Sequence, residues 1–388
     1  MVPPSGLIDL GLKCKLKLQE WQSMPMAKHN QRRALVLAWM ASQAQGLAER
    51  RRVLQGGGCA AAASLWPGGG AAAAPLPTWD LGNGVAMPTL ALNTVGLTVE
   101  STERAVLAAL DAGVSHVDFH PGAERDGVAR ALRRAPRSSL FLTTKVQSQQ
   151  GNPSVSPAAA ADLCRRQIDA DRRALGVDAL DMWLVRDSPN CDVVRSQWAV
   201  LEDARRRGAV RAIGTVNFCE AQLDCLLATA DVKPAVNYYM LHVGMGADAH
   251  GLRSHGEARG VRTFAYGALG EPGPSAELLA DGPLARVAAE YGKSPEEVAV
   301  RWLTQIGVAV SARPTTRFGL GVSACDDDGS CAAGLRKRAA TFDWTLSKAD
   351  VAALSKLAAP DSPTPALFSK ACNPDLGTGS ARDPLRVL

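Results

Sequence analysis

The stretch HVDFHPGAERDGVARAL (residues 116–132) contains a short apolar run that ends near Asp118 and is followed by a segment with helical spacing of apolar residues. Short apolar runs favour buried strands, and longer amphipathic segments favour helices. The stretch therefore predicts one strand followed by one helix. From about residue 80 onward the same succession recurs along the chain, which is typical of α/β domains with a parallel sheet.

Eight such strand candidates follow one another, with helical segments between them. They are TLALNT (89–94), SHVDFH (115–120), LFLTTKV (140–146), ALDMWLVR (179–186), VRAIGTVNF (210–218), AVNYYMLH (235–242), VRTFAYGAL (261–269) and VAVSAR (308–313). Eight β/α units in roughly 250–300 residues match the size of a (β/α)8 TIM barrel. A doubly wound sheet is the alternative, but no GxGxxG pattern follows the first strand. The sequence thus predicts an α/β fold built as a (β/α)8 barrel.

The N-terminal part, residues 1–78, differs from the rest in composition. It carries nine Lys and Arg residues against three Asp and Glu, so the excess positive charge of the chain (+5) lies in this segment. It ends in a Gly-, Ala- and Pro-rich tract that specifies no core, which predicts a disordered extension. An organellar transit peptide for a chloroplast or mitochondrion is the alternative to a cytoplasmic protein. The barrel is predicted for residues 79–360, and a C-terminal tail for 361–388.

Composition excludes several classes of protein. With 46% hydrophobic and 21% charged residues, the chain reads as a globular protein with a sizeable core. Outside residues 1–78 the charge is nearly balanced, so nucleic acid is not an expected partner. No apolar run reaches the ~20 residues of a membrane span. The nine cysteines are scattered without a CxxC pair, which predicts reduced thiols rather than disulfides or a metal site.

The ends of the predicted strands contain the candidate reactive residues, because barrel enzymes carry their chemistry in the βα loops. Asp118 and Lys145 each end an apolar run, where an unpaired charge is costly. An ion pair between neighbouring strands removes this cost and leaves a polarised site, although a purely structural pair explains the pattern equally well. His120 follows Asp118 by two residues, so both side chains point to the same face of a strand.

Nine blocks of sequence extend this pattern in collinear order. They are NGVAMPTLALNT, HVDFH with VARAL, LFLTTKV, LGVDALDMWLVRDSP, VRAIGTVNF, KPAVNYYMLH, FAYGALG, EYGKSPEEVAVRWLTQIGVAVSARP and FDWTLSKADVAAL. Together they resemble the aldo/keto reductase superfamily over roughly residues 79–360. The resemblance implies a (β/α)8 barrel that binds NADP(H) and reduces small aldehydes or ketones.

Four residues perform the chemistry in that family, and the chain matches two of them. Asp118 and Lys145 match the pair that lowers the pKa of a proton-donating tyrosine. The tyrosine itself falls at Ala123, and the histidine that orients the carbonyl falls at Arg186. Arginine stays protonated and transfers no proton, but it donates hydrogen bonds to anions. Arg186 either pairs with Asp118 or Asp187 or holds an anionic ligand.

The resemblance assigns cofactor binding to Thr94, Asn217, Tyr238, Tyr266 and Arg313. Asn217 matches the residue that holds the nicotinamide carboxamide, and Tyr266 matches the tyrosine that stacks on the nicotinamide ring. Arg313 keeps the positive charge used for the adenosine 2′-phosphate. The chain departs from the family pattern at three positions, namely Asn93, Val216 and Tyr238.

Three hypotheses about function follow. The first is an NADP(H)-dependent reductase with altered or weakened proton donation, in which His120 or water supplies the proton. The second is a catalytically inactive barrel, a pseudoenzyme that serves as a nucleotide-binding scaffold or regulator. The third gives the barrel new chemistry on an anion held by Lys145 and Arg186. Substrate identity and oligomeric state stay open.

Overall fold

The computed structural model describes residues 76–82, 84–147, 154–269, 282–314, 325 and 329–357. The predicted tail and all but the last residues of the predicted leader lie outside these ranges. A hairpin of two antiparallel strands, β1 (Thr78–Asp80) and β2 (Ala86–Pro88), precedes the barrel. Its apolar side chains, Val85 and Met87 among them, are buried in the cluster that fills the barrel interior. The hairpin therefore covers one end of the barrel.

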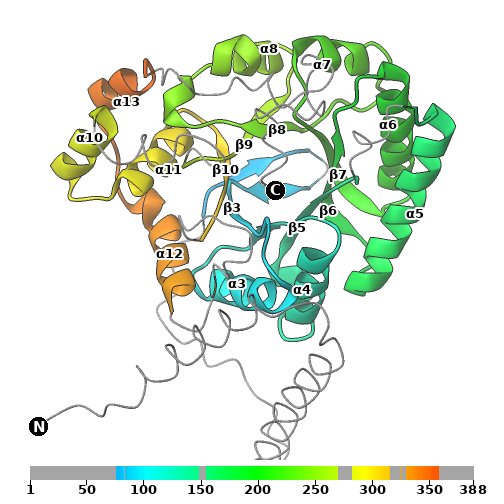
Figure 1. Cartoon of the computed structure of the whole chain (residues 1–388), viewed down its shortest axis with the longest axis horizontal. Coiled ribbons are helices and arrows are strands. Elements are labelled where there is room, and N and C mark those ends of the chain that lie inside the picture. Colours follow the sequence, from blue (N-terminus) through cyan, green and yellow to red (C-terminus); the bar gives the residue numbers. More distant parts are fainter. Residues whose placement is uncertain are drawn as a thin grey trace, which may run out of the picture. The chain divides into compact units, whose positions relative to one another are not determined.

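Eight parallel strands close into a barrel in the order β10-β3-β4-β5-β6-β7-β8-β9 (Figure 1). Their bounds are β3 Leu90–Asn93, β4 His116–Asp118, β5 Phe141–Lys145, β6 Leu180–Arg186, β7 Val210–Val216, β8 Val236–Met240, β9 Arg262–Tyr266 and β10 Ala309–Ala312. Each strand lies within one of the eight predicted runs. The predicted (β/α)8 barrel is confirmed, and strands that follow one another in the sequence are neighbours in the barrel, as is usual for this fold.

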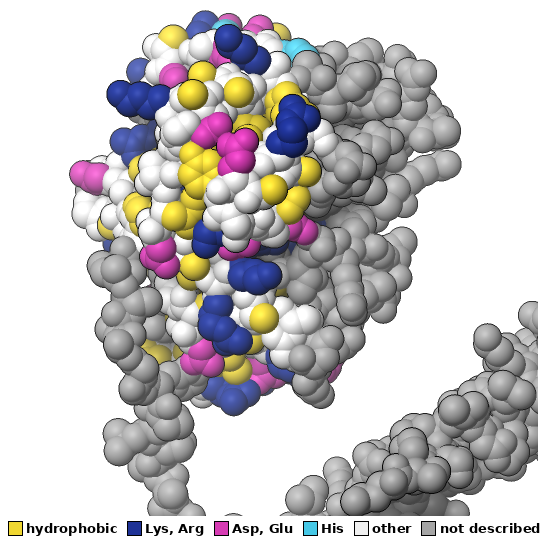
Figure 2. Space-filling view, turned by 90° about the vertical axis from the view of Figure 1, so that its left-hand side faces the viewer, with side chains coloured by type: hydrophobic (Ala, Val, Ile, Leu, Met, Phe, Trp, Pro, Cys, Tyr) yellow, Lys and Arg dark blue, Asp and Glu magenta, His cyan; other side chains and the backbone are white. Residues whose placement is uncertain are grey.

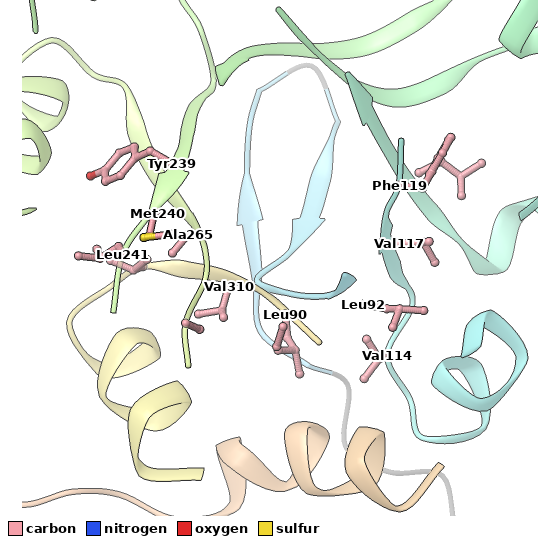
Figure 3. Close-up of a cluster of buried hydrophobic side chains, with 14 of the residues drawn as sticks. Leu90, Leu92, Val114, Val117, Phe119, Tyr239, Met240, Leu241, Ala265 and Val310 are labelled. Carbon is pink, nitrogen blue, oxygen red and sulfur yellow. The ribbon is translucent and has the colours of Figure 1, made fainter. Parts of the chain in front are cut away.

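Successive side chains along each strand lie in two different apolar clusters. Residues such as Ala91, Phe141, Met182 and Phe264 form a cluster inside the barrel. Their neighbours on the same strands form a larger cluster between barrel and helices, part of which Figure 3 shows: Leu90, Leu92, Val117, Tyr239, Ala265 and Val310. A period of two residues follows from the strand geometry. It explains why strands buried on both sides are continuous apolar runs in the sequence.

Helices surround the strands (Figure 1). Their bounds are α3 Val99–Asp111, α4 Ala123–Leu132, α5 Pro157–Leu175, α6 Cys191–Arg206, α7 Glu220–Leu227, α8 Leu252–Glu257, α10 Pro283–Tyr291, α11 Pro295–Gln305, α12 Ser330–Ala339 and α13 Lys348–Leu354. Short 3-10 turns occur at Arg137–Ser139, Val243–Met245, Ala249–Gly251 and Ala340–Asp343. A side-chain N-cap begins α3, α5, α6, α11 and α13. Ser294, for example, forms a capping box with Glu297 ahead of α11.

The prediction that the cysteines stay reduced is wrong. Cys191 at the start of α6 is joined by a disulfide to Cys225 in α7, and Cys325 is joined to Cys331 in α12. The first pair is 34 residues apart in the sequence, and its Cα atoms are 6.4 Å apart because α6 and α7 are neighbours in the fold. The positions of the two cysteines in the sequence do not indicate that they are close in the fold. Among the described residues Cys164 is a free, buried thiol.

The surface shown in Figure 2 carries Lys and Arg side chains interspersed with Asp and Glu. This mixture agrees with the nearly balanced charge of the sequence beyond residue 78. No helix in the described part of the chain is long and apolar enough to cross a membrane. Within the same ranges, no cluster of three His, Cys, Asp or Glu side chains is arranged to hold a metal ion.

Candidate active site

The inward-facing side chains at the carboxyl ends of the strands change from apolar to polar. On β6 the inward row runs from Met182 through Leu184 to Arg186, which is partly exposed. Asp118 on β4, Lys145 on β5 and other polar residues end the corresponding rows of their strands. The barrel thus gathers in one place the residues that the sequence distributes over seventy positions or more, as expected for this fold.

Asp118 is the centre of a buried hydrogen-bond network. Its Oδ1 accepts a hydrogen bond from Lys145 Nζ, and both side chains are almost completely buried. Its Oδ2 accepts from the Tyr238 hydroxyl and, at 2.7 Å, from Ser311 Oγ. Asn93 Nδ2 donates to Tyr238 and Ser311 at 3.2 and 3.1 Å. The predicted Asp118–Lys145 pair is therefore present, and the Tyr238 and Ser311 hydroxyl groups bind the second carboxylate oxygen, with Asn93 as a donor to both hydroxyl groups.

The network fixes the charges of its members. Burial raises the pKa of Asp118, but the Lys145 charge and the hydrogen bonds outweigh it, so the pKa lies below its usual value. Burial lowers the pKa of Lys145, against the opposing effect of Asp118. Burial and then the Asp118 charge raise the pKa of Tyr238 well above its usual value. Tyr238 is therefore a poor proton donor, because its hydroxyl is held by an ionised carboxylate.

Position 123, where the family's tyrosine is expected, lies at the start of α4. Ala123 is the first residue of the helix and is exposed to solvent. The next residue, Glu124, is buried, and its carboxylate binds four donors. Oε1 accepts from the backbone N–H of Gly96 at 3.0 Å, whereas Oε2 accepts from Thr94 Oγ1 at 2.7 Å. Oε2 also lies 2.9 Å from the backbone nitrogen of His120 and 3.1 Å from its Nδ1.

This arrangement fixes the tautomer of His120. Burial raises the pKa of Glu124, but the nearby His120 and the hydrogen bonds from His120 and Thr94 outweigh it and lower the pKa. An ionised carboxylate only accepts hydrogen bonds, so Nδ1 of His120 carries a proton. The second ring nitrogen, Nε2, has no hydrogen-bond partner among the described residues, and the side chain is 24% exposed. Burial and then the Lys145 charge lower the pKa of His120.

Arg186 is partly exposed and forms no hydrogen bond or ion pair with another described residue. The interpretation in which it pairs with Asp118 is wrong, because Lys145, Tyr238 and Ser311 occupy that carboxylate. Next to burial as the main cause, the positive charge of Arg186 helps to lower the pKa values of His120 and Lys145. In the barrel, Arg186 pairs in register with Val216 of β7, directly before Asn217.

Among the positions assigned to a cofactor, Asn217 and Tyr266 lie together. The Tyr266 hydroxyl donates to Asn217 Oδ1 at 2.8 Å, and the tyrosine ring is partly exposed. Asn217 has a positive φ of 58°, which asparagine tolerates better than most residues. No described residue bonds its amide nitrogen. A flat ring beside an unpaired amide donor fits a nicotinamide carboxamide.

The remaining cofactor positions lie in different surroundings. Thr94 is fully buried, and its hydroxyl contacts Glu124 and the Asp118 carbonyl. Tyr238 lies inside the barrel, with its ring centroid 5.0 Å from that of Tyr266 and 4.9 Å from Lys145 Nζ. Arg313 is partly exposed and directly follows β10.

The sequence reasoning missed Glu124 and Ser311. Glu124 follows His120 by four residues, a spacing that brings side chains together in helical backbone and could have been noticed. Ser311 belongs to an alternating run, VAVSAR, in which it is the only residue with a side-chain hydroxyl. Its partner Asp118 is 193 positions away, so only barrel closure brings the two together.

Residues 81–318 match the sequence model of the aldo/keto reductase family. An aldo-keto reductase of Mycobacterium avium (strain 104) is 34% identical over 243 residues, which cover 61% of this chain and 80% of the relative. A 2,5-diketo-D-gluconic acid reductase B of Corynebacterium sp. is 32% identical over 237 residues, covering 60% of this chain and 80% of the relative.

Solved structures show the same fold. An aldo/keto reductase of Brucella melitensis superposes with a TM-score of 0.61 at 25% identity, over 72% of this chain and 99% of that protein. A Bombyx mori aldo-keto reductase, solved in complex with NADP, gives 0.60 at 21% identity, over 77% of this chain and 94% of the other. With the barrel, the Asp118–Lys145 pair and the match over residues 81–318, the chain belongs to the aldo/keto reductase family.

Proposed function

We propose that the protein is an NADP(H)-dependent oxidoreductase that reduces small aldehydes or ketones, with His120 as the proton donor. The contact between His120 Nδ1 and the Glu124 carboxylate, at 3.1 Å, carries this proposal. It holds the imidazole in one orientation and leaves Nε2 for the substrate. A histidine oriented by a carboxylate is an effective proton-transfer group. A relative named for a diketo acid supports a small carbonyl substrate.

The residues present fit a nicotinamide cofactor. Asn217 and the Tyr266 ring would hold the nicotinamide, and Arg313 would contribute charge toward the adenosine end. When bound, NADPH supplies the hydride. The chain's own residues then orient the carbonyl and deliver the proton. Lys145 and Asp118 stay paired and buried at the carboxyl ends of β5 and β4.

Binding and turnover test the proposal together. The full chain is titrated with NADPH, followed by cofactor fluorescence, and then assayed with a panel of small aldehydes and ketones. We expect saturable binding at micromolar concentrations and slow NADPH consumption with at least one carbonyl. The absence of binding at tens of micromolar would reject the proposal. Binding without turnover of any panel member would favour the second candidate, a nucleotide-binding barrel without catalysis.

The pH dependence separates His120 from the other candidate donor. Burial lowers the pKa of His120, so the neutral imidazole predominates at pH 7. Reduction requires the imidazolium, and its rate should therefore rise about tenfold per pH unit as pH falls toward that pKa, then level off. Alcohol oxidation requires the neutral ring and should show the opposite dependence. Initial rates of both directions between pH 5 and 9 provide the measurement.

A different profile identifies a different donor. The pKa of Tyr238 is raised well above its usual value, so a reaction that used this phenol would show no change in rate across pH 5–9. A flat profile for reduction would thus contradict the assignment to His120.

A further inference from the structure

Proton transfer by His120 gives no role to Arg186. Arg186 is the last residue of the inward row Met182, Leu184, Arg186 on β6. Below it the barrel interior is apolar, and the pairing of Lys145 with Leu184 places β5's lysine one layer deeper. A guanidinium that follows an apolar row and is only partly exposed loses part of its hydration, and an anion in the site would compensate that loss.

No ion pair joins Arg186 to a carboxylate of the described residues. The Asp118 carboxylate is bonded to Lys145 and two hydroxyl groups, and Glu124 is bonded to His120, Thr94 and Gly96. Elsewhere in the barrel, arginine side chains are paired with a buried carboxylate. Asp181, for example, accepts hydrogen bonds from two arginines, Arg137 and Arg211, at 2.6 and 2.8 Å. Arg186 is left as a cation at the carboxyl end of β6 without a hydrogen-bond or ion-pair partner among the described residues.

We propose that Arg186 binds the carboxylate of the substrate, so that the protein acts preferentially on 2-oxo acids and similar carbonyl compounds that carry a carboxylate next to the carbonyl. Guanidinium groups bind carboxylates through two parallel hydrogen bonds, which fixes orientation as well as position. Arg186 pairs in register with Val216 of β7, and the next residue, Asn217, binds the hydroxyl of Tyr266, the proposed nicotinamide platform. His120, the proposed proton donor, directly follows the end of β4 at the same end of the barrel. A carboxylate held there would lie at the end of the barrel where the hydride and the proton are supplied.

This inference rests on the proposed function, and the test keeps the two separate. Pyruvate and its methyl ester are compared as substrates of the full chain, because they differ in charge at one position. The specificity is the ratio of kcat/KM for pyruvate to kcat/KM for methyl pyruvate. Arg186→Gln should lower this ratio by roughly 10- to 100-fold, as expected for one lost charge-assisted pair. Arg186→Lys keeps the positive charge but lacks the two parallel N–H donors of the guanidinium, so it should restore part of the ratio.

Arg211→Gln is the matched control, since it removes the same charge from the amino-terminal end of the neighbouring strand β7. It should leave the ratio unchanged. The affinity of each variant for NADPH and its melting temperature are measured in parallel. An unchanged ratio in a folded Arg186→Gln variant that turns over methyl pyruvate would overturn the inference and leave the proposed function standing. Weaker NADPH binding with an unchanged ratio would assign Arg186 to a cofactor phosphate and overturn it as well.

Discussion

Replacement of His120 by alanine should lower kcat for carbonyl reduction by about 10²- to 10⁴-fold, the usual contribution of a positioned general acid. The affinity for NADPH should stay within about twofold, because the proposed cofactor residues Asn217 and Tyr266 contact each other and not His120. The removed ring leaves space for a small molecule. Added imidazole should therefore restore part of the rate, with a pH dependence that follows imidazole itself. Single-turnover kinetics with and without imidazole provide the measurement.

Two further variants distinguish catalysis from structural support. Glu124→Gln retains an acceptor for Nδ1 but removes the charge that stabilises the imidazolium, so the pH at which reduction accelerates should move downward. Tyr238→Phe removes the hydroxyl of the other candidate proton donor and should leave that pH unchanged. An active His120→Ala variant with an unaltered pH profile would instead show that His120 is a packed residue without a part in proton transfer.

Most of the fold could be predicted from the sequence, because each β/α unit carries its own pattern. Runs such as LDMWLVR are apolar on both faces, and the helices between them have clear start signals such as Ser294 with Glu297. The disulfide between Cys191 and Cys225 could not be predicted in the same way. It depends on how two helices pack, which is a property of the closed barrel and not of any local stretch.

The candidate site was only partly predictable for the same reason. Asp118 and Lys145 stand out because a charge at the end of an apolar run is unusual. The absence of a tyrosine at position 123 is also plain from the sequence. The role of Glu124 depends on the conformation of the chain between Asp118 and α4, which turns the buried carboxylate toward His120 and leaves Ala123 in solvent. A spacing rule alone does not specify that turn.

Replacement of Lys145 by methionine should lower the free energy of unfolding at pH 7 by about 3–5 kcal/mol, the usual effect of breaking a buried ion pair from one side. Both partners are almost completely buried, so no solvent compensates the remaining Asp118 carboxylate. The double variant Asp118→Asn with Lys145→Met leaves no unpaired charge and should recover most of the loss. Urea unfolding of the wild type, the single variant and the double variant provides the comparison.

The loss of unfolding free energy in Lys145→Met should also depend on pH, and its direction follows from the pKa of Asp118. In the wild type the pKa of Asp118 is lowered, mainly because Lys145 overcomes the effect of burial, so the pair stabilises the fold above the pKa of the unfolded chain and this stabilisation disappears in acid. In Lys145→Met the largest effect that opposes burial is removed, so the pKa of Asp118 rises from its wild-type value, and the variant is least affected when Asp118 is protonated. The difference between the two proteins should therefore be small near pH 4 and grow toward pH 7. A difference that stays constant over this range would show that the loss comes from packing around the methionine and not from an uncompensated charge.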